Sequence, residues 1–92
     1  MRERVPPLLW IRAFEAAARH NSFLAAGREL SVSAAAVSRC IKDLEKAIDV
    51  VLFARRPCGV DLTAAGRRYA QALTPALRQI AAASADIRAA AQ

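Results

Sequence analysis

The sequence is poor in the residues on which several protein classes depend. Its 92 residues contain two cysteines, Cys40 and Cys58, and one histidine, His20. Two cysteines this far apart exclude a disulfide scaffold and a Cys/His metal site, and they are typical of a reducing cytoplasm. No apolar run reaches the length of a membrane span, and residues 1–7 carry charges and prolines in place of the apolar core of a secretory signal. We therefore expect neither secretion nor insertion into a membrane.

Signatures of catalysis are also lacking. The chain has three glycines and no glycine-rich phosphate cradle, no paired carboxylates in an apolar cleft, and no nucleophile with a base other than His20. Its length and its 55% of hydrophobic residues allow one small domain with a modest core and no deep substrate cavity. We expect no enzymatic activity, no cofactor and no metal. His20 is expected to stabilise a helix end, where the helix dipole favours a cation.

Positive charge, in contrast, is abundant. Fourteen Lys and Arg residues stand against eight Asp and Glu residues, and the formal net charge is +6. The expected partner is an anionic polymer or surface, and nucleic acid fits best. Arginines outnumber lysines twelve to two. The planar guanidinium suits phosphates and guanine edges, although GC-rich codon usage would produce the same excess.

The first third of the sequence predicts a pair of short helices. The first is expected at residues 8–20, after two prolines, and its apolar stripe comprises Leu8, Ile11, Phe14 and Ala18. Asn21 tolerates the left-handed conformation that ends a helix, and Ser22 can cap a second helix at residues 23–30. The inward positions of this second helix are Phe23, Ala26, Gly27 and Leu30. Its small residues would let a third helix approach closely.

A third helix is expected after a turn of about three residues. Val32 is predicted to be buried in this turn, and Ser33 to cap the helix that follows. The inner face of that helix comprises Val37, Ile41, Leu44 and Ile48. Its outward residues are Ala34, Ala35, Ser38, Arg39 and Lys42. Two helices joined by such a turn are typical of a helix-turn-helix.

A short hairpin and a long helix complete the predicted fold. Strands are expected at residues 50–53 and 60–63, joined by a loop at 55–59, and this hairpin would form a wing. Thr63 can cap a last helix from Ala64, which we interpret as one helix bent at Pro75. A new segment capped by Thr74 is the alternative. The sequence thus predicts an all-α fold with a small β-wing: a winged helix-turn-helix domain at residues 1–63 and a linker helix at 64–92. Nothing ends this helix before Gln92, so we expect a longer parent protein.

The last helix carries an apolar stripe with alternating steps of four and three, the spacing of a coiled coil. The stripe comprises Gly66, Ala70, Leu73, Leu77, Ile80, Ser84, Ile87 and Ala91. Leu73, Leu77, Ile80, Ser84 and Ile87 are the candidate dimer interface. The alternative is that the stripe packs on its own domain. The aromatic residues Trp10, Phe14, Phe23 and Phe53 are expected in the core.

Together, several fragments in this order resemble the LysR-type transcriptional regulators. They are Ala13-Phe14, Ser22-Phe23, Leu30-Ser31-Val32-Ser33, Ala36-Val37-Ser38-Arg39, Leu44-Glu45, Leu52-Phe53 with Arg55, and Leu62-Thr63 with Gly66. The resemblance implies a winged helix-turn-helix and a linker helix that pairs antiparallel with that of a second copy. It also implies a carboxy-terminal domain, absent from this chain, through which a small-molecule effector would act. Residues 6–8 and 14–20 look like the branch that includes glycine-cleavage and β-lactamase activators.

The sequence departs from the family pattern at several positions. Ala34 and Cys40 stand where the family often has polar readers such as Gln, so direct base readout by hydrogen bonds is reduced. Asp49 replaces the usual Gly and tolerates a left-handed turn at some cost. Cys58 and Asp61 occupy wing positions where basic residues are frequent, so the contacts of the wing depend on its arginines.

We predict that residues 34–48 enter the major groove of double-stranded DNA at a promoter or operator. Ser33 and Lys42 would contact phosphates, Ser38 and Arg39 would lie nearer the bases, and Ala34 and Ala35 would touch thymine methyl groups. The alternative is an ordinary solvated helix face.

The wing and the second helix supply the remaining predicted contacts. Arg55 and Arg56 would contact a minor groove, unless they only protect a solvated hairpin tip or Arg55 holds the fold. Ser22 would bond a phosphate or act only as a cap. A cysteine switch at Cys40 or Cys58 is a minor alternative.

The predicted function is regulation of transcription by a homodimer that binds a roughly palindromic DNA site. The predicted localisation is cytoplasmic, at the nucleoid. An interaction or dimerisation module with incidental basic charge is the first alternative, and the arginines of the wing argue against it. A membrane-active cationic helix is the second. It is disfavoured because the arginines of the last helix form no clustered stripe.

Overall fold

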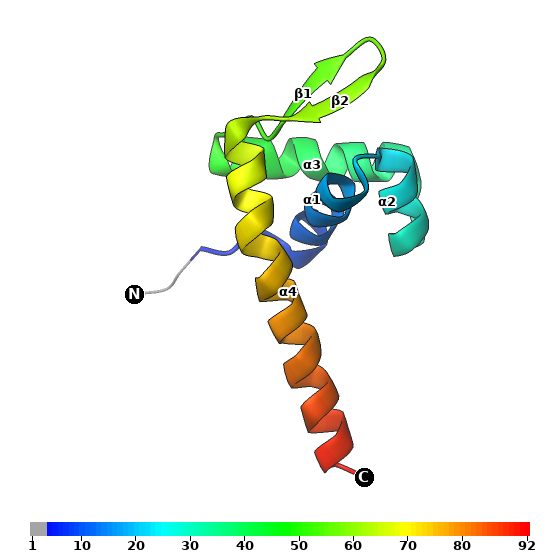
Figure 1. Ribbon diagram of the computed structural model, residues 1–92, viewed down its shortest axis with the longest axis vertical. Coiled ribbons are helices and arrows are strands. Elements are labelled where there is room, and N and C mark those ends of the chain that lie inside the picture. Colours follow the sequence, from blue (N-terminus) through cyan, green and yellow to red (C-terminus); the bar gives the residue numbers. More distant parts are fainter. Residues whose placement is uncertain (1–3) are drawn as a thin grey trace.

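The computed structural model describes residues 4–92 (Figure 1). Residues 1–3, with which the predicted domain 1–63 begins, lie outside the described part. The elements are α1 (Leu8–His20), α2 (Phe23–Leu30), α3 (Ala34–Ile48), β1 (Phe53–Arg56), β2 (Gly59–Leu62) and α4 (Ala64–Ala90). This order confirms the predicted fold, a mostly helical domain with a two-stranded wing and a long last helix.

The helix boundaries are set by local caps. Ser22 Oγ accepts a hydrogen bond from the Ala25 N–H at 3.0 Å, and Ser33 Oγ accepts one from the Ala36 N–H at 3.0 Å. Asn21 and Asp49 adopt the left-handed conformation, with φ of 52° and 58°, and end α1 and α3. These observations confirm the predicted helix ends. The ends could be predicted because each cap needs only residues within one turn of the chain.

Helix α1 is the central element and packs against α2, α3 and α4. Helices approach it from several sides, so its buried positions include Ala13, Ala16 and Ala17 beside the expected Ile11 and Phe14. The prediction that Leu8 faces the core is wrong. Leu8 is 48% exposed because it lies in the first turn, at the edge of a groove between α1 and α4.

The core lies between α1, α3 and the base of the wing. Its largest fully buried side chains are Phe14, Val37, Ile41, Leu44 and Leu52. The Phe14 ring lies edge-on to Phe53 at 5.7 Å and stacks on Tyr69 of α4 at 5.5 Å. Trp10 and Phe23 are half-buried against the core, as the aromatic prediction requires. Burial of each large apolar side chain stabilises the fold by about 1.5–3 kcal/mol.

The turn between α2 and α3 differs from its prediction at Val32. A Cβ added to Gly27 would lie 2.5 Å from the Val32 carbonyl oxygen, so the backbone of the turn rests directly on α2. Glycine is required there for this close approach. The contact is made by backbone, and the Val32 side chain is 38% exposed, not buried.

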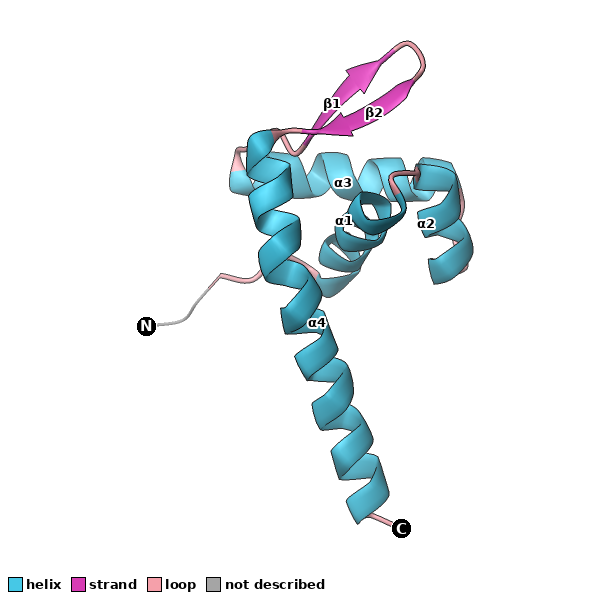
Figure 2. Cartoon of the chain, viewed as in Figure 1, coloured by secondary structure: helices cyan, strands magenta, loops and turns pink. Residues whose placement is uncertain are grey.

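The wing, the magenta hairpin of Figure 2, begins later in the sequence than predicted, at Phe53. Residues 50–52 are not in a strand, because the Glu45 carboxylate accepts the Leu52 and Phe53 N–H groups at 2.7 and 3.1 Å. The Thr63 hydroxyl also donates to the Val51 carbonyl at 2.7 Å. Antiparallel pairing then runs from Phe53↔Leu62 to Arg56↔Gly59, so the predicted loop 55–59 shrinks to two residues.

Helix α4 runs through Pro75 as a single helix, and the new segment capped by Thr74 does not form. Thr63 Oγ1 caps its start by accepting the Gly66 N–H at 3.0 Å. A Cβ on Gly66 would lie 2.2 Å from the Leu52 carbonyl oxygen, so only glycine permits this contact with the wing base. In the part of the chain that the structure describes, no helix combines the length and apolar character that a membrane crossing needs.

The apolar stripe of α4 divides into two parts. Ala70, Leu73 and Leu77 are half-buried against the core of their own domain. Ile80 and Ile87 are 51% and 72% exposed, and Ser84 is exposed between them. Figure 1 shows this second part of α4 extending away from the other helices. Part of the stripe that was predicted to pack against a second copy therefore packs against the core of the same chain.

Candidate nucleic-acid interface

The outward face of α3 is the centre of the candidate site. Val37, Ile41 and Leu44 anchor the opposite face of α3 in the core with no exposed surface. Ala35, Arg39 and Lys42 are exposed and Ser38 is half-buried, and together they line a shallow hollow along the helix. Among residues 4–92, no ion pair engages Arg39 or Lys42. Both cations are therefore free to meet an external anion.

The amino ends of α2 and α3 each carry a serine cap. Ser22 and Ser33 use an oxygen lone pair to accept a backbone N–H, and each hydroxyl hydrogen remains available to donate. Ser33 is exposed and Ser22 is half-buried. A helix amino terminus also presents unpaired amides and a partial positive charge. Both caps can thus hold a phosphate oxygen while they stabilise their helices.

The two arginines of the wing are held in different ways. The Arg55 guanidinium lies over the Phe23 ring, 5.5 Å from its centroid, which is a cation–π contact. Arg56 forms an ion pair with Asp61 of the facing strand, and both side chains are more than half exposed. An exposed pair of this kind contributes little stability. A phosphate can therefore replace the Asp61 carboxylate at small cost.

The predicted site residues fall into two neighbouring groups. Arg55 and Arg56 share a hollow with Ser22 between the amino end of α2 and the wing. Ala35, Ser38, Arg39 and Lys42 share the separate hollow along α3. Ala34, half-buried, follows Ser33 at the start of α3. The predicted dimer residues lie apart from both groups, on α4.

Glu45 is a residue whose role the sequence did not reveal. It lies on α3 after the buried Leu44, and its carboxylate holds the first amides of the wing through Leu52 and Phe53. Two backbone donors on one carboxylate tie the wing to α3. The sequence shows only an acidic residue next to the inner face of α3, a few residues before a predicted strand. Such an acid is usually solvated, so its position alone does not predict a contact with the wing.

The surroundings of Cys40 do not activate its thiol. Burial and the nearby Asp43 raise the pKa of Cys40, and the neighbouring Arg39 lowers it by less. The raised pKa opposes formation of the thiolate. Cys58 is exposed in the turn of the wing, and both cysteines are free. Within residues 4–92, no cluster of three His, Cys, Asp or Glu residues could hold a metal ion.

Comparison with known sequences gives consistent matches. The family model for bacterial regulatory helix-turn-helix proteins of the lysR family matches residues 8–67. The carbapenem-hydrolyzing β-lactamase transcriptional activator of Enterobacter cloacae is 46% identical over 83 residues, 90% of this chain and 28% of that protein. The glycine cleavage system transcriptional activator of Escherichia coli is 49% identical over 69 residues, 75% of this chain and 23% of that protein. The chain therefore spans about a quarter of the length of these curated relatives.

Solved structures of similar shape include complexes with DNA. The BenM DNA-binding domain bound to catB site 1 DNA matches with a TM-score of 0.84 and 25% identity, covering 92% of this chain and 94% of that one. The CbnR DNA-binding domain in its DNA complex matches with a TM-score of 0.78 and 31% identity, covering 91% and 97%.

Proposed function

This chain belongs to the lysR family of bacterial regulatory helix-turn-helix proteins, and on that premise we propose that it binds double-stranded DNA at specific sites and regulates transcription. The observation that carries the proposal is the free cationic face of α3, where Arg39 and Lys42 are exposed above a fully buried inner stripe. The relatives in Enterobacter cloacae and Escherichia coli are transcriptional activators, and the BenM and CbnR domains of similar shape are bound to DNA.

Helix α3 would lie in the major groove, which is wide enough to admit one helix. Arg39 can donate two hydrogen bonds to a guanine edge, and Ser38 lies one position before it. Ala34 and Ala35 can touch thymine methyl groups, which is readout without hydrogen bonds. Lys42, one turn further along, and Ser33 at the amino end would contact phosphates on either side of the groove.

The wing would lie beside the adjacent minor groove. Arg56 would exchange Asp61 for a backbone phosphate, because the exposed pair is weak. Arg55 would contact DNA from its place over Phe23, and Ser22 would donate its hydroxyl to a phosphate at the start of α2. In this arrangement one hollow between α2 and the wing holds a single stretch of DNA backbone.

The active unit would be a homodimer formed through α4. Ile80 and Ile87 offer exposed apolar surface, and Ser84 fits between them because its hydroxyl is already bonded to the Ile80 carbonyl at 2.9 Å. Leu73 and Leu77 would border this surface with their exposed parts. A small-molecule effector would act through the remainder of a longer protein. A regulator of this kind works at the nucleoid, in the cytoplasm.

A salt titration of binding tests the proposal. Fluorescence anisotropy of the chain with duplexes enriched from a random library should give a slope of log affinity against log salt of about −5 to −10 for a dimer. Arg39→Ala should weaken binding, whereas Arg88→Ala removes the same charge from the far end of α4 and should change it little. A slope near zero would contradict groove binding. Dimerisation without any affinity for duplex would favour an interaction module, and sedimentation with anionic vesicles would favour a membrane-active helix.

A further inference from the structure

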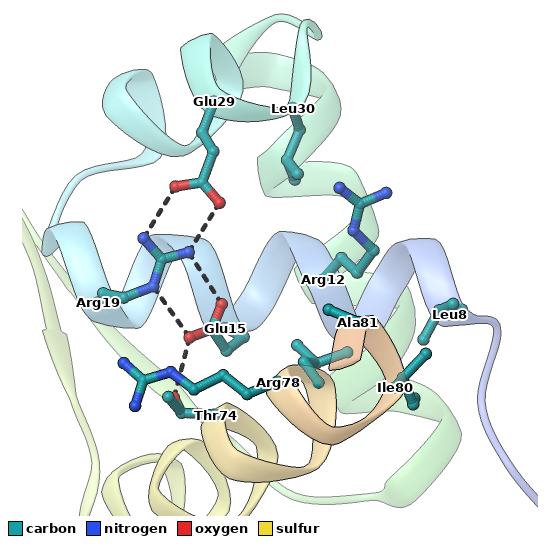
Figure 3. A pocket seen from close by; sticks show the side chains of 11 residues that line it. Leu8, Arg12, Glu15, Arg19, Glu29, Leu30, Thr74, Arg78, Ile80 and Ala81 are labelled. Atoms are coloured by element: carbon teal, nitrogen blue, oxygen red, sulfur yellow. Dashed lines mark hydrogen bonds and ion pairs between the residues drawn. The ribbon is translucent and has the colours of Figure 1, made fainter. Parts of the chain in front are cut away.

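Glu15 is a buried charged residue that joins two distant parts of the chain. It lies on α1 with 6% of its surface exposed. Its carboxylate accepts hydrogen bonds from Nε and Nη2 of Arg19, both at 3.0 Å, and from the Thr74 hydroxyl at 2.9 Å (Figure 3). Thr74 follows Glu15 by 59 residues and belongs to α4. One carboxylate thus connects the centre of the DNA-binding domain to the long last helix.

The same cluster extends to α2. Arg19 donates from Nη1 and Nη2 to the two oxygens of Glu29, at 2.9 and 2.7 Å, and Nε2 of His20 lies 2.7 Å from Glu29 Oε1. Hydrogen bonds from Arg19 lower the pKa of Glu15, and Thr74 adds to this effect, against the opposing effect of burial. Hydrogen bonds from Arg19 and His20 lower the pKa of Glu29 to about 2. Both carboxylates are therefore ionised at neutral pH, and the cluster joins α1, α2 and α4.

The bond to Thr74 lies at the weakest point of α4. Pro75 has no N–H, so the helix lacks one backbone hydrogen bond in this turn, and kinks are common at such positions. Leu77 is the last half-buried residue of α4, and residues 78–90 are exposed. Beyond Leu77, packing within the chain therefore does little to fix the direction of α4.

A hydrogen bond to a buried carboxylate constrains direction more tightly than apolar contact does. Apolar surfaces can slide on each other with little loss, whereas a hydrogen bond weakens steeply with distance and angle. If α4 moved so that Thr74 no longer reached Glu15, the carboxylate would lose one of its donors, and hydrogen bonds to charged groups are the costlier ones to lose. One orientation of α4 is thus favoured over its neighbours.

We propose that Glu15, held by Arg19 and bonded to Thr74, is a positioning residue that sets the direction in which α4 leaves the DNA-binding domain, and thereby the half-site spacing that the dimer accepts. The effect on spacing rests on the proposed function, whereas the effect on the direction of α4 does not. Residues 75–90 span about 24 Å at about 1.5 Å per residue, so a change of about 10° at Thr74 moves the end of α4 by about 4 Å. That displacement exceeds the rise of one base pair, about 3.4 Å.

The direction of α4 can be measured without DNA. Spin labels at Arg28→Cys on α2 and Ala85→Cys on α4, in a chain with Cys40→Ala and Cys58→Ser, report one distance by double electron–electron resonance. Dilution with unlabelled chain removes distances between copies. Both labelled positions are exposed, so the labels leave the core intact.

Variants at Thr74 separate the hydroxyl from the shape of the side chain. Thr74→Val keeps the branched shape and removes the donor, and it should broaden or shift the distance distribution in a chain that circular dichroism shows to be folded. Thr74→Ser keeps the donor and should retain the narrow distribution of the unsubstituted chain. Gln71→Ala is the control, since it removes an exposed polar side chain of α4 one turn before Thr74 and outside the candidate dimer interface. An unchanged narrow distribution in Thr74→Val would overturn the proposal.

A selection of half-site spacing tests the consequence for DNA. Half-sites enriched with the unsubstituted chain are placed in duplexes at spacings that differ by single base pairs. The unsubstituted chain and Thr74→Ser should prefer one spacing, and Thr74→Val should spread over neighbouring spacings with unchanged affinity for a single half-site. Identical spacing preferences would overturn the inference while leaving DNA binding intact. Failure of every chain to bind duplex would overturn the proposed function, and the distance measurement would still decide the role of Glu15.

Discussion

The guanidinium of Arg55 lies 5.5 Å from the centroid of the Phe23 ring, and this contact links the wing to the amino end of α2. Phe23 in turn meets Phe53 of β1 edge-on at 5.3 Å. The hairpin is therefore held at two points, by an aromatic contact at its base and by a cation–π contact further along β1. Both points involve Phe23, the residue after Ser22, so direct contacts position the wing against the amino end of α2.

The two wing arginines should differ in their effect on stability. Arg55→Ala should lower the free energy of unfolding by about 0.5–1 kcal/mol, because it removes an exposed cation–π contact. Arg56→Ala should leave stability nearly unchanged, since its pair with Asp61 is exposed. Urea unfolding measures both, and salt titration should show a similar loss of slope for each. Equal destabilisation by the two variants would contradict the assigned contacts.

Arg39 and Lys42 should separate specificity from general affinity. Arg39→Ala should cost about 1–3 kcal/mol on the selected duplex and little on random duplex, because a base contact is lost. Lys42→Ala should weaken binding to both duplexes alike and reduce the salt slope by about one, because a phosphate contact is lost. Competition binding on the two duplexes distinguishes these outcomes, and an equal loss for Arg39→Ala on both would refute its role in base readout.

Glu45 should hold the base of the wing. Glu45→Ala leaves the Leu52 and Phe53 amides without their acceptor, and the expected loss of stability is about 1–3 kcal/mol for each amide that finds no other partner. Glu45→Gln keeps one acceptor oxygen and should lie between. Hydrogen exchange of the two amides should accelerate in the same order. Lys46→Ala, a change at the adjacent exposed position, is the control and should leave this exchange unchanged.

The free energy of unfolding should fall at acid pH, as the two glutamates bonded to Arg19 are protonated. The pKa of Glu29 is lowered from 4.5 to about 2 in the folded chain, so its contribution is present above about pH 4.5 and is lost as the pH falls toward 2. The lowered pKa of Glu15 acts in the same direction. Thermal unfolding followed across this range should show a decline that is shallower in Glu29→Gln. A decline of the same size in that variant would assign the pH dependence to other groups.

The exposed end of α4 should carry the dimer. Burial of an isoleucine contributes about 1.5–3 kcal/mol, so Ile87→Glu should raise the dimer dissociation constant at least about tenfold. Leu24→Glu places the same charge at another exposed apolar position, on α2, and should leave association unchanged. Analytical ultracentrifugation over a concentration series gives both constants. Equal weakening by the two variants would show that the effect is one of charge and not of position.

Much of the candidate site could be predicted because it depends on helical periodicity. Val37, Ile41 and Leu44 form the buried face of α3, and helical periodicity then places Arg39 and Lys42 on the exposed face. This result does not depend on the details of packing. The wing was predicted less well. Its strands shift because Glu45 and Thr63 take the backbone groups of residues 51–53, and propensity says nothing of such side-chain acceptors and donors.

The sequence by itself determined most of the helix ends, although α4 ends at Ala90 and not at the predicted Gln92. Ser22, Ser33 and Thr63 each bond an amide three residues later, and Asn21 and Asp49 need only their own backbone conformation. Only the tertiary structure decided where the long-range polar groups meet. Glu15 bonds to Thr74, 59 residues later in the chain, and Arg55 contacts Phe23, 32 residues earlier in the chain. The physical reason is that a cap is completed within one turn of backbone, whereas a buried carboxylate is satisfied by whichever donor the packing of distant helices brings to it.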